Sequence, residues 1–184
     1  MRTVADIGSF VSSRPDMMRL LTALEGLSLP DAWIGAGFIR NAVWDFLTGR
    51  TGAAPANDVD AIYLDAADLN PGTDLAIEAR LRQLCPGVPW QVTNQARMHR
   101  RDADAPWRDA AEAIAHWPET ATAIAARSVR GRVEILAPFG IDDLAGLIVR
   151  PTPAFVARRD VCRLRLEQKQ WRSRWPELTL RDME

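Results

Sequence analysis

Short apolar strands alternate with helical segments through the first hundred residues, which limits the chain to folds in which helices pack on a sheet. The spacing of apolar residues predicts an N-terminal helix over residues 15–28, with Pro15 suited to its first turn. Strands are expected at Ala32–Ile34, Asp58–Leu64 and Trp90–Asn94. Helices are expected between them, over 38–47 and 75–84. The fold class is therefore α/β (α+β), with a mixed sheet.

The second half of the chain predicts a hairpin and a basic helix. The hairpin is expected over 121–129 and 132–136, around Arg130-Gly131, and Asp142 suits the N-cap of a short helix through Leu147. Residues 51–57 and 97–108 are expected to be loops. The 184 residues fit one domain, with a core over 32–150 and an Arg-rich last helix over 155–175.

Composition gives no global indication of a nucleic-acid or membrane partner, because the formal net charge is −1 and no apolar run reaches the length of a membrane span. The N-terminal residues have no continuous apolar stretch of the secretory type. Two cysteines, far apart, do not form a disulfide framework. We therefore expect a cytoplasmic protein without a disulfide-linked partner.

Asp58 and Asp60 are separated by one residue at the start of an expected strand. Because residues i and i+2 of a strand point to the same face, the two carboxylates are expected side by side. Two like charges at this separation raise each other's pKa unless a cation lies between them. The pair indicates a site for a hard cation, Mg²⁺ or Mn²⁺, although an isolated D-x-D also begins many solvated edge strands.

Gly35, Ala36 and Gly37 follow a short apolar strand and open a helix. The first backbone N–H groups of a helix have no intrahelical partner and lie at its positive end, which suits the phosphates of a nucleotide. Arg40 lies in the first turn and offers a guanidinium group to phosphate. The same glycines also suit a tight turn and close packing.

The order of these motifs carries a resemblance. The segments 36–41 (AGFIRN), 47–50 (LTGR) and 58–60 (DVD) resemble the G-G-x-V-R-D, L-L-G-R and D-x-D head of the CCA-adding enzymes, members of the polymerase β nucleotidyltransferase superfamily. A closer resemblance spans almost the whole chain. It includes GAGFIRNAVWD, NDVDAIYLD, NQARMH, WPETATA and APFGIDDL, and it is to a bacterial nucleotidyltransferase family formerly catalogued as a domain of unknown function.

The resemblance implies a polymerase β-type fold and the transfer of a nucleoside monophosphate from an NTP to an acceptor. Asp58 and Asp60 would be the catalytic, metal-binding pair. The nucleotide would be bound by Gly35, Ala36, Gly37, Arg40 and Asn41. The acceptor class, whether a small molecule, a protein or RNA, is left open.

Departures from the family motif bear on catalysis. Ala36 replaces the first glycine of the pair, and Asn41 stands where the CCA-adding enzymes have an aspartate. The superfamily commonly takes a third carboxylate from a neighbouring strand, and Asn94 occupies the expected place. Substitutes for it are Glu119, Glu134, Asp142 and Asp143.

Asn94, Arg97 and His99 lie together where a strand is expected to end, a usual place for binding groups in mixed sheets. We expect them to contact the nucleotide, or else to satisfy loop carbonyls.

Two other functions are compatible with the sequence. Without a third carboxylate the fold would serve as a non-catalytic nucleotide-binding or regulatory module. Alternatively, the basic last helix, with Trp171 and Trp175, would form a surface for RNA, or would instead pack its apolar side on the sheet.

Overall fold

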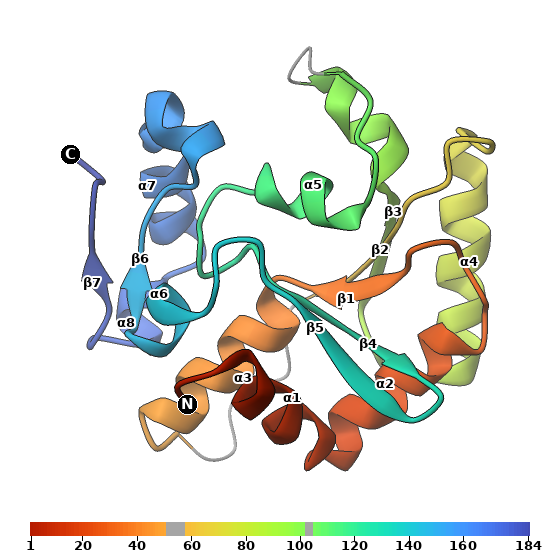
Figure 1. Cartoon of the computed structure of the whole chain (residues 1–184), viewed down its shortest axis with the longest axis horizontal. Helices are drawn as coiled ribbons and strands as arrows, with labels where there is room; N and C mark the ends of the chain where they lie inside the picture. Colours follow the sequence, from red (N-terminus) through yellow and green to blue (C-terminus); the bar gives the residue numbers. More distant parts are fainter. Residues whose placement is uncertain (51–57, 102–104) are drawn as a thin grey trace.

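The computed structural model describes residues 1–50, 58–101 and 105–184 (Figure 1). The loop expected at 51–57 lies outside these residues, as does part of the loop expected at 97–108. Among the described residues, no helix combines the length and the apolar character required to cross a bilayer.

A five-stranded mixed sheet forms the centre of the fold, as expected from the sequence. Its strands are β1 (Trp33–Gly35), β2 (Val59–Tyr63), β3 (Trp90–Asn94), β4 (Ala125–Val129) and β5 (Arg132–Leu136). They lie in the order β3-β2-β1-β4-β5. The pair β2–β3 is parallel and the other three pairs are antiparallel. A second sheet of two parallel strands pairs β6 (Ile148–Val149) with β7 (Thr179–Leu180) and was not predicted.

The helices of the first half match the expected positions, with small differences at their ends. They are α2 (Pro15–Glu25), α3 (Gly37–Leu47) and α4 (Pro71–Leu84); a further short helix, α5 (Ala110–Ala115), precedes β4. The helix expected over 15–28 ends at Glu25. An additional helix, α1 (Val4–Ser12), was missed, although Thr3 and Asp6 form a capping box at its start.

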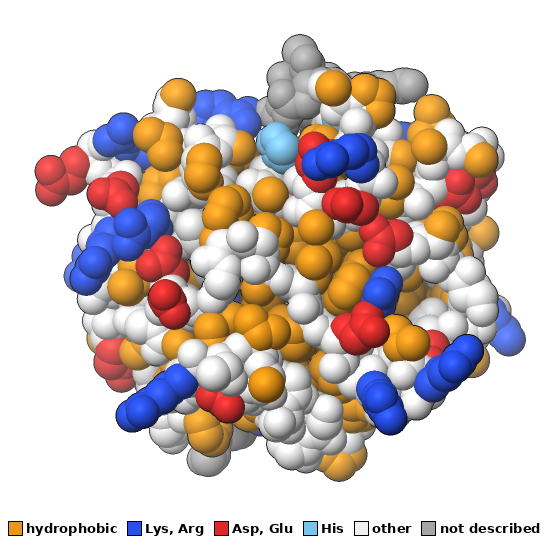
Figure 2. Space-filling view, in the orientation of Figure 1, with side chains coloured by type: hydrophobic (Ala, Val, Ile, Leu, Met, Phe, Trp, Pro, Cys, Tyr) orange, Lys and Arg blue, Asp and Glu red, His pale blue; other side chains and the backbone are white. Residues whose placement is uncertain are grey.

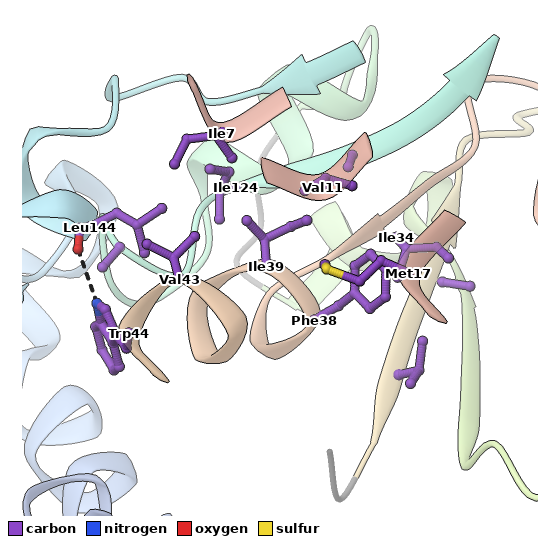
Figure 3. Packing of buried hydrophobic residues seen from close by; sticks show 14 of the residues in the cluster. Ile7, Val11, Met17, Ile34, Phe38, Ile39, Val43, Trp44, Ile124 and Leu144 are labelled. Carbon is purple, nitrogen blue, oxygen red and sulfur yellow. Dashed lines mark hydrogen bonds between the residues drawn. The ribbon is translucent and has the colours of Figure 1, made fainter. Parts of the chain in front are cut away.

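The main hydrophobic core lies on one face of the sheet. Figure 3 shows Ile7, Val11 and Met17 of α1 and α2 packed against Ile39 and Val43 of α3. In the same view the indole Nε1 of Trp44 donates a hydrogen bond to the carbonyl oxygen of Leu144, 3.1 Å away. The opposite face carries a smaller cluster, in which α5 covers strand residues; its members are Trp33, Ile62, Ala110, Ile114 and Ala125.

The prediction of one continuous basic helix over 155–175 is wrong. The segment forms a 3₁₀ helix η2 (Pro153–Arg158), then α7 (Arg159–Gln168) and α8 (Trp171–Arg174). Gln170 separates the last two with a φ of 50°, in the left-handed region. Trp171 and Trp175 are buried and pack edge-on against Trp44 of α3, with ring centroids 5.8 and 5.1 Å apart. Figure 1 shows α8, in blue, near the orange α3.

Three local expectations also need correction. The first strand of the hairpin begins at Ala125 rather than at residue 121, because Glu119 bridges to Pro151 and a turn follows. The short helix α6 (Asp142–Ala145) has Ile141 as its N-cap, so that Asp142 is its first residue. Within the region expected to be an exposed loop, residues 95–101 form a 3₁₀ helix, η1, and Trp107 is buried.

Candidate functional site

Strand register brings the glycine turn and the aspartate pair together. Gly35 is the cross-strand partner of Asp60, and Trp33 is the partner of Ile62. Side chains alternate along a strand, so Asp60 points to the same face as Ile62, the face that α5 covers, and Asp58 precedes it by two residues. The pair therefore lies away from the main core, directly beside the start of α3.

The turn from β1 into α3 is shaped by neighbouring side chains. A side chain at Gly35 would collide with the indole of Trp117, whose ring carbon would lie 2.7 Å from a Cβ atom. Ala36 has a φ of 53° and a ψ of −122°, a conformation that glycine adopts far more readily. Gly37 is the first residue of α3, and a Cβ there would lie 3.3 Å from the Nδ2 of Asn41.

Asp60 shows the electrostatic strain of a paired, partly buried carboxylate. Burial raises its pKa to about 6, and the charge of Asp58 acts in the same direction. Lys169, Arg40 and Arg165 lower the pKa and only partly offset these effects. The two carboxylates therefore repel each other within a site where cations are already present.

Lys169, at the C-terminal end of α7, supplies one of those cations. Its Nζ lies 3.2 Å from the Oδ2 of Asp58. The two residues are 111 positions apart in the sequence. The last helices thus contribute directly to the surroundings of the aspartate pair.

Arg40 is almost wholly buried, with 5% of its surface exposed. Its Nη1 donates to the hydroxyl of Thr122 at 2.7 Å, and its Nε and Nη2 donate to the Oδ1 of Asn41. The guanidinium also stacks on the ring of Trp171, 4.1 Å from its centroid. Burial lowers the pKa of Arg40 to about 10, opposed by the charge of Glu119. Arg40 thus joins α3 to the last helices, and its charge acts on Asp58 and Asp60.

Glu119 is distinctive among the four candidate carboxylates. It is fully buried, its Oε1 accepts from the Nε of Arg165 at 2.8 Å, and its Oε2 has no hydrogen-bond partner. The other three have different surroundings. Asp143 is bound by Thr120 and Arg150, Glu134 is paired with Arg127, and Asp142 is exposed.

Asn94, Arg97 and His99 are not part of this cluster. Asn94 is level with Tyr63, three residues along β2 from Asp60, and its side chain bonds the backbone of Asp65, Asp68 and Ala96. Arg97 pairs with Asp74. His99 lies beside Trp107, at a ring-centroid distance of 6.4 Å. As nucleotide contacts these three residues stay predictions without support from their placement.

The donors present fit a hard divalent cation. Carboxylate oxygens are ligands that Mg²⁺ prefers, and water and phosphate oxygens usually complete its coordination. Within the part of the chain that the structure describes, no three His, Cys, Asp or Glu side chains are grouped to hold a metal.

Lys169, Arg165, Thr122 and Trp117 were not predicted as parts of the site. Their contacts join residues that are far apart in the sequence and on different elements. One signal was available, since Lys169 is the only lysine in a chain otherwise rich in arginine.

The structure favours the packing interpretation of the last helices over an RNA surface. The prediction that Trp171 and Trp175 form part of an RNA-binding surface is wrong, because both side chains are buried. Many of the basic side chains make bonds within the chain, among them Arg163 to Met183, Arg165 to Glu119, Lys169 to Asp58 and Arg174 to Asp45. On the face drawn in Figure 2, acidic and basic side chains are interspersed.

Comparisons with known proteins agree with this architecture. The model of a family described as Nucleotidyltransferase matches residues 22–180. A solved structure described as revealing a CCA-adding enzyme head domain is 31% identical, with a TM-score of 0.83, over 96% of this chain and 95% of that one. None of the curated proteins compared matches the sequence.

Larger solved structures share the fold. A CCA-adding enzyme with CTP is 17% identical, with a TM-score of 0.57, over 98% of this chain and 43% of that one. The Thermotoga maritima CCA-adding enzyme complexed with tRNA is 16% identical, with a TM-score of 0.57, over 98% and 42%. This chain thus spans less than half the length of these two enzymes.

Proposed function

The chain belongs to the nucleotidyltransferase family, and on this premise we propose that it transfers a nucleoside monophosphate from an NTP to an acceptor hydroxyl, with Mg²⁺ or Mn²⁺. The observation that carries the proposal is the register of β1 and β2. It sets Asp60 across from Gly35, at the point where the chain turns into α3. Carboxylates for a metal and amides for phosphates thus lie side by side.

Asp58 and Asp60 are the proposed metal ligands and the catalytic pair. A metal held there would neutralise charge on the phosphates and on the attacking and leaving oxygens of an in-line displacement. The positions of the two carboxylates determine where the metal ion would neutralise that charge. Burial raises the pKa of Asp60, the charge of Asp58 adds to that shift, and a divalent cation between the two carboxylates would relieve their repulsion.

The turn at Gly35, Ala36 and Gly37 is the proposed phosphate site. The first amides of α3 lie at the positive end of an eleven-residue helix. Gly37 has no side chain to block a phosphate, and Asn41 lies one helical turn further on. Buried Arg40 adds positive potential and holds Asn41 through two of its nitrogens.

RNA is the first acceptor to test, because a solved structure of the same fold is a CCA-adding enzyme complexed with tRNA. The terminal hydroxyl of an RNA is chemically suitable as a nucleophile. Small-molecule and protein hydroxyls are the alternatives, and all three can be screened by release of pyrophosphate.

The proposal is tested by Asp58→Asn and Asp60→Asn, which keep the shape and remove the charge. Each change should weaken Mg²⁺-dependent NTP binding at least about tenfold and abolish transfer, since each removes a metal ligand. Glu167→Gln, on the exposed side of α7, is the matched control for loss of one negative charge and should change neither property. Unchanged nucleotide affinity and turnover in the double variant would refute the assignment.

A non-catalytic nucleotide-binding module remains the second candidate. It is favoured by the pairing of Lys169 with Asp58 and of Arg165 with Glu119, which places protein cations on the carboxylates. It predicts NTP binding without release of pyrophosphate, whichever acceptor is supplied. One productive acceptor would exclude it.

A further inference from the structure

We propose that Lys169 is a triphosphate-binding residue, supported by Arg165, and that Asp58 holds its ammonium group until metal and nucleotide bind. The inference rests on the proposed function and extends it to α7. Lys169 and Arg165 are four residues apart in the sequence, so they lie on the same side of the helix end. Each is bonded to a carboxylate at the site.

The charges around the aspartate pair differ in how freely they can move. Arg40 is buried, stacked on Trp171 and bonded to Thr122 and Asn41, so it cannot turn toward a ligand without breaking these contacts. The side chain of Lys169 is 43% exposed and has a flexible four-carbon stem. Of these two cations, Lys169 is therefore the one that can change partner.

The backbone that carries Lys169 is held in place. Gln170 follows in the left-handed conformation, and the buried indole of Trp171 then packs against Trp44 and Arg40. A fixed backbone with a movable ammonium group is the arrangement expected of a ligand-binding lysine. An ordinary surface ion pair has no need of such an anchor.

Metal binding and the Lys169–Asp58 pair compete for one oxygen atom. The ammonium group lies 3.2 Å from Oδ2 of Asp58, where a divalent cation would also bind. When the cation takes that oxygen, the freed ammonium group faces a triphosphate with about four negative charges. Lysine binds phosphate as a point charge and tolerates such a change of geometry. Arg165 stays paired with buried Glu119, with 32% of its side chain exposed toward solvent.

Opposite effects on two affinities distinguish this exchange from a merely structural role. The probes are Mn²⁺ alone, followed by electron paramagnetic resonance, and Mg²⁺ with inorganic tripolyphosphate, followed by calorimetry, which avoids any choice of base. In Lys169→Met, no ammonium group competes with the metal ion for Asp58, so Mn²⁺ should bind about two- to fivefold more tightly. Mg²⁺-tripolyphosphate should bind about tenfold more weakly, because the phosphates lose a cation.

Two variants serve as controls. Lys169→Arg should restore tripolyphosphate binding to within about threefold of the wild type. Arg172→Met removes the same charge from the exposed side of α8 and should change neither affinity by more than about twofold.

The outcomes separate the two proposals. Tripolyphosphate binding at wild-type strength in Lys169→Met would overturn the inference and leave the proposed function intact. A parallel loss of both affinities would also overturn it, as the sign of a structural role. A wild-type protein that binds neither Mg²⁺-tripolyphosphate nor Mg²⁺-NTP would remove the proposed function itself, and the inference with it.

Discussion

At the residue scale, Ala36 has a backbone conformation that suits glycine better than alanine. A non-glycine residue held in such a region costs about 1–3 kcal/mol, and glycine itself loses about 0.5–1 kcal/mol of conformational entropy. Ala36→Gly should therefore raise the free energy of unfolding by about 1 kcal/mol, measured by urea denaturation.

The matched control is Ala42→Gly, within the same helix α3. There the same substitution relieves no strain and should lower the free energy of unfolding by about 1 kcal/mol. Equal losses at the two positions would show that Ala36 is not strained.

The raised pKa of Asp60 predicts a pH-dependent cost to folding. Its pKa is about 6 in the folded protein and 3.8 as the reference value, so the folded state binds the proton more tightly. Below about pH 4 the carboxyl is protonated in both states and costs nothing. As the pH rises through 6 the folded state must carry a buried charge, and the free energy of unfolding falls.

Asp60→Asn removes that cost. It should raise the free energy of unfolding by about 1–3 kcal/mol at pH 8 and change it much less at pH 4, as each pKa unit corresponds to about 1.4 kcal/mol. Urea denaturation at the two pH values measures the difference. The same gain at both would mean that the charge of Asp60 is not its source.

At the element scale, Asp45 connects α3 to α8. One of its oxygens accepts from the indole Nε1 of Trp175 at 2.9 Å, and the other accepts from Nη2 of Arg174 at 2.8 Å. Asp45→Ala leaves a buried indole N–H unsatisfied and should cost about 2–4 kcal/mol. Hydrogen exchange should show α8 losing protection more than β2.

Glu177→Ala provides the comparison from the same region. Glu177 pairs with Arg50 at 3.2 Å, and both side chains are partly exposed. Its loss should lower the free energy of unfolding much less than the loss of Asp45 does, because exposed ion pairs contribute little. A similar cost for both variants would mean that burial of the Asp45 contacts does not determine their strength.

For the whole molecule, the sequence predicts elements whose signals are local. Period-two strands such as Trp90–Asn94 and the amphipathic α2 are readable because a half-buried surface imposes its pattern on consecutive residues. The glycine turn and the D-x-D are also local motifs, and the register of β1 and β2 places Gly35 beside Asp60; their role as a site stays a prediction. The end of the helical conformation at Gln170 could not be predicted from the sequence, because the packing of Trp171 on α3 overrides a locally continuous helical pattern.

The rest of the site depends on contacts between distant residues. Lys169 meets Asp58 and Arg165 meets Glu119 only after the chain has folded, and no periodicity marks such pairs. The hydrogen bonds of Asn94 could not be predicted either. Its position at the end of a strand suggests a binding group, and parallel register places it level with Tyr63, where its side chain donates to the carbonyl oxygen of Asp65. A contact with the nucleotide stays a prediction.

The cluster of Trp44, Trp171 and Trp175 has a spectroscopic consequence. The indoles of Trp171 and Trp175 each lie within 6 Å of the indole of Trp44, edge to face, and Arg40 stacks on Trp171. Rings so close and so fixed couple their electronic transitions, so near-ultraviolet circular dichroism and intrinsic fluorescence report on this contact without an added label. Lys169 is two residues from Trp171, so we expect these tryptophan signals to change when a ligand binds at the neighbouring Asp58 and Asp60.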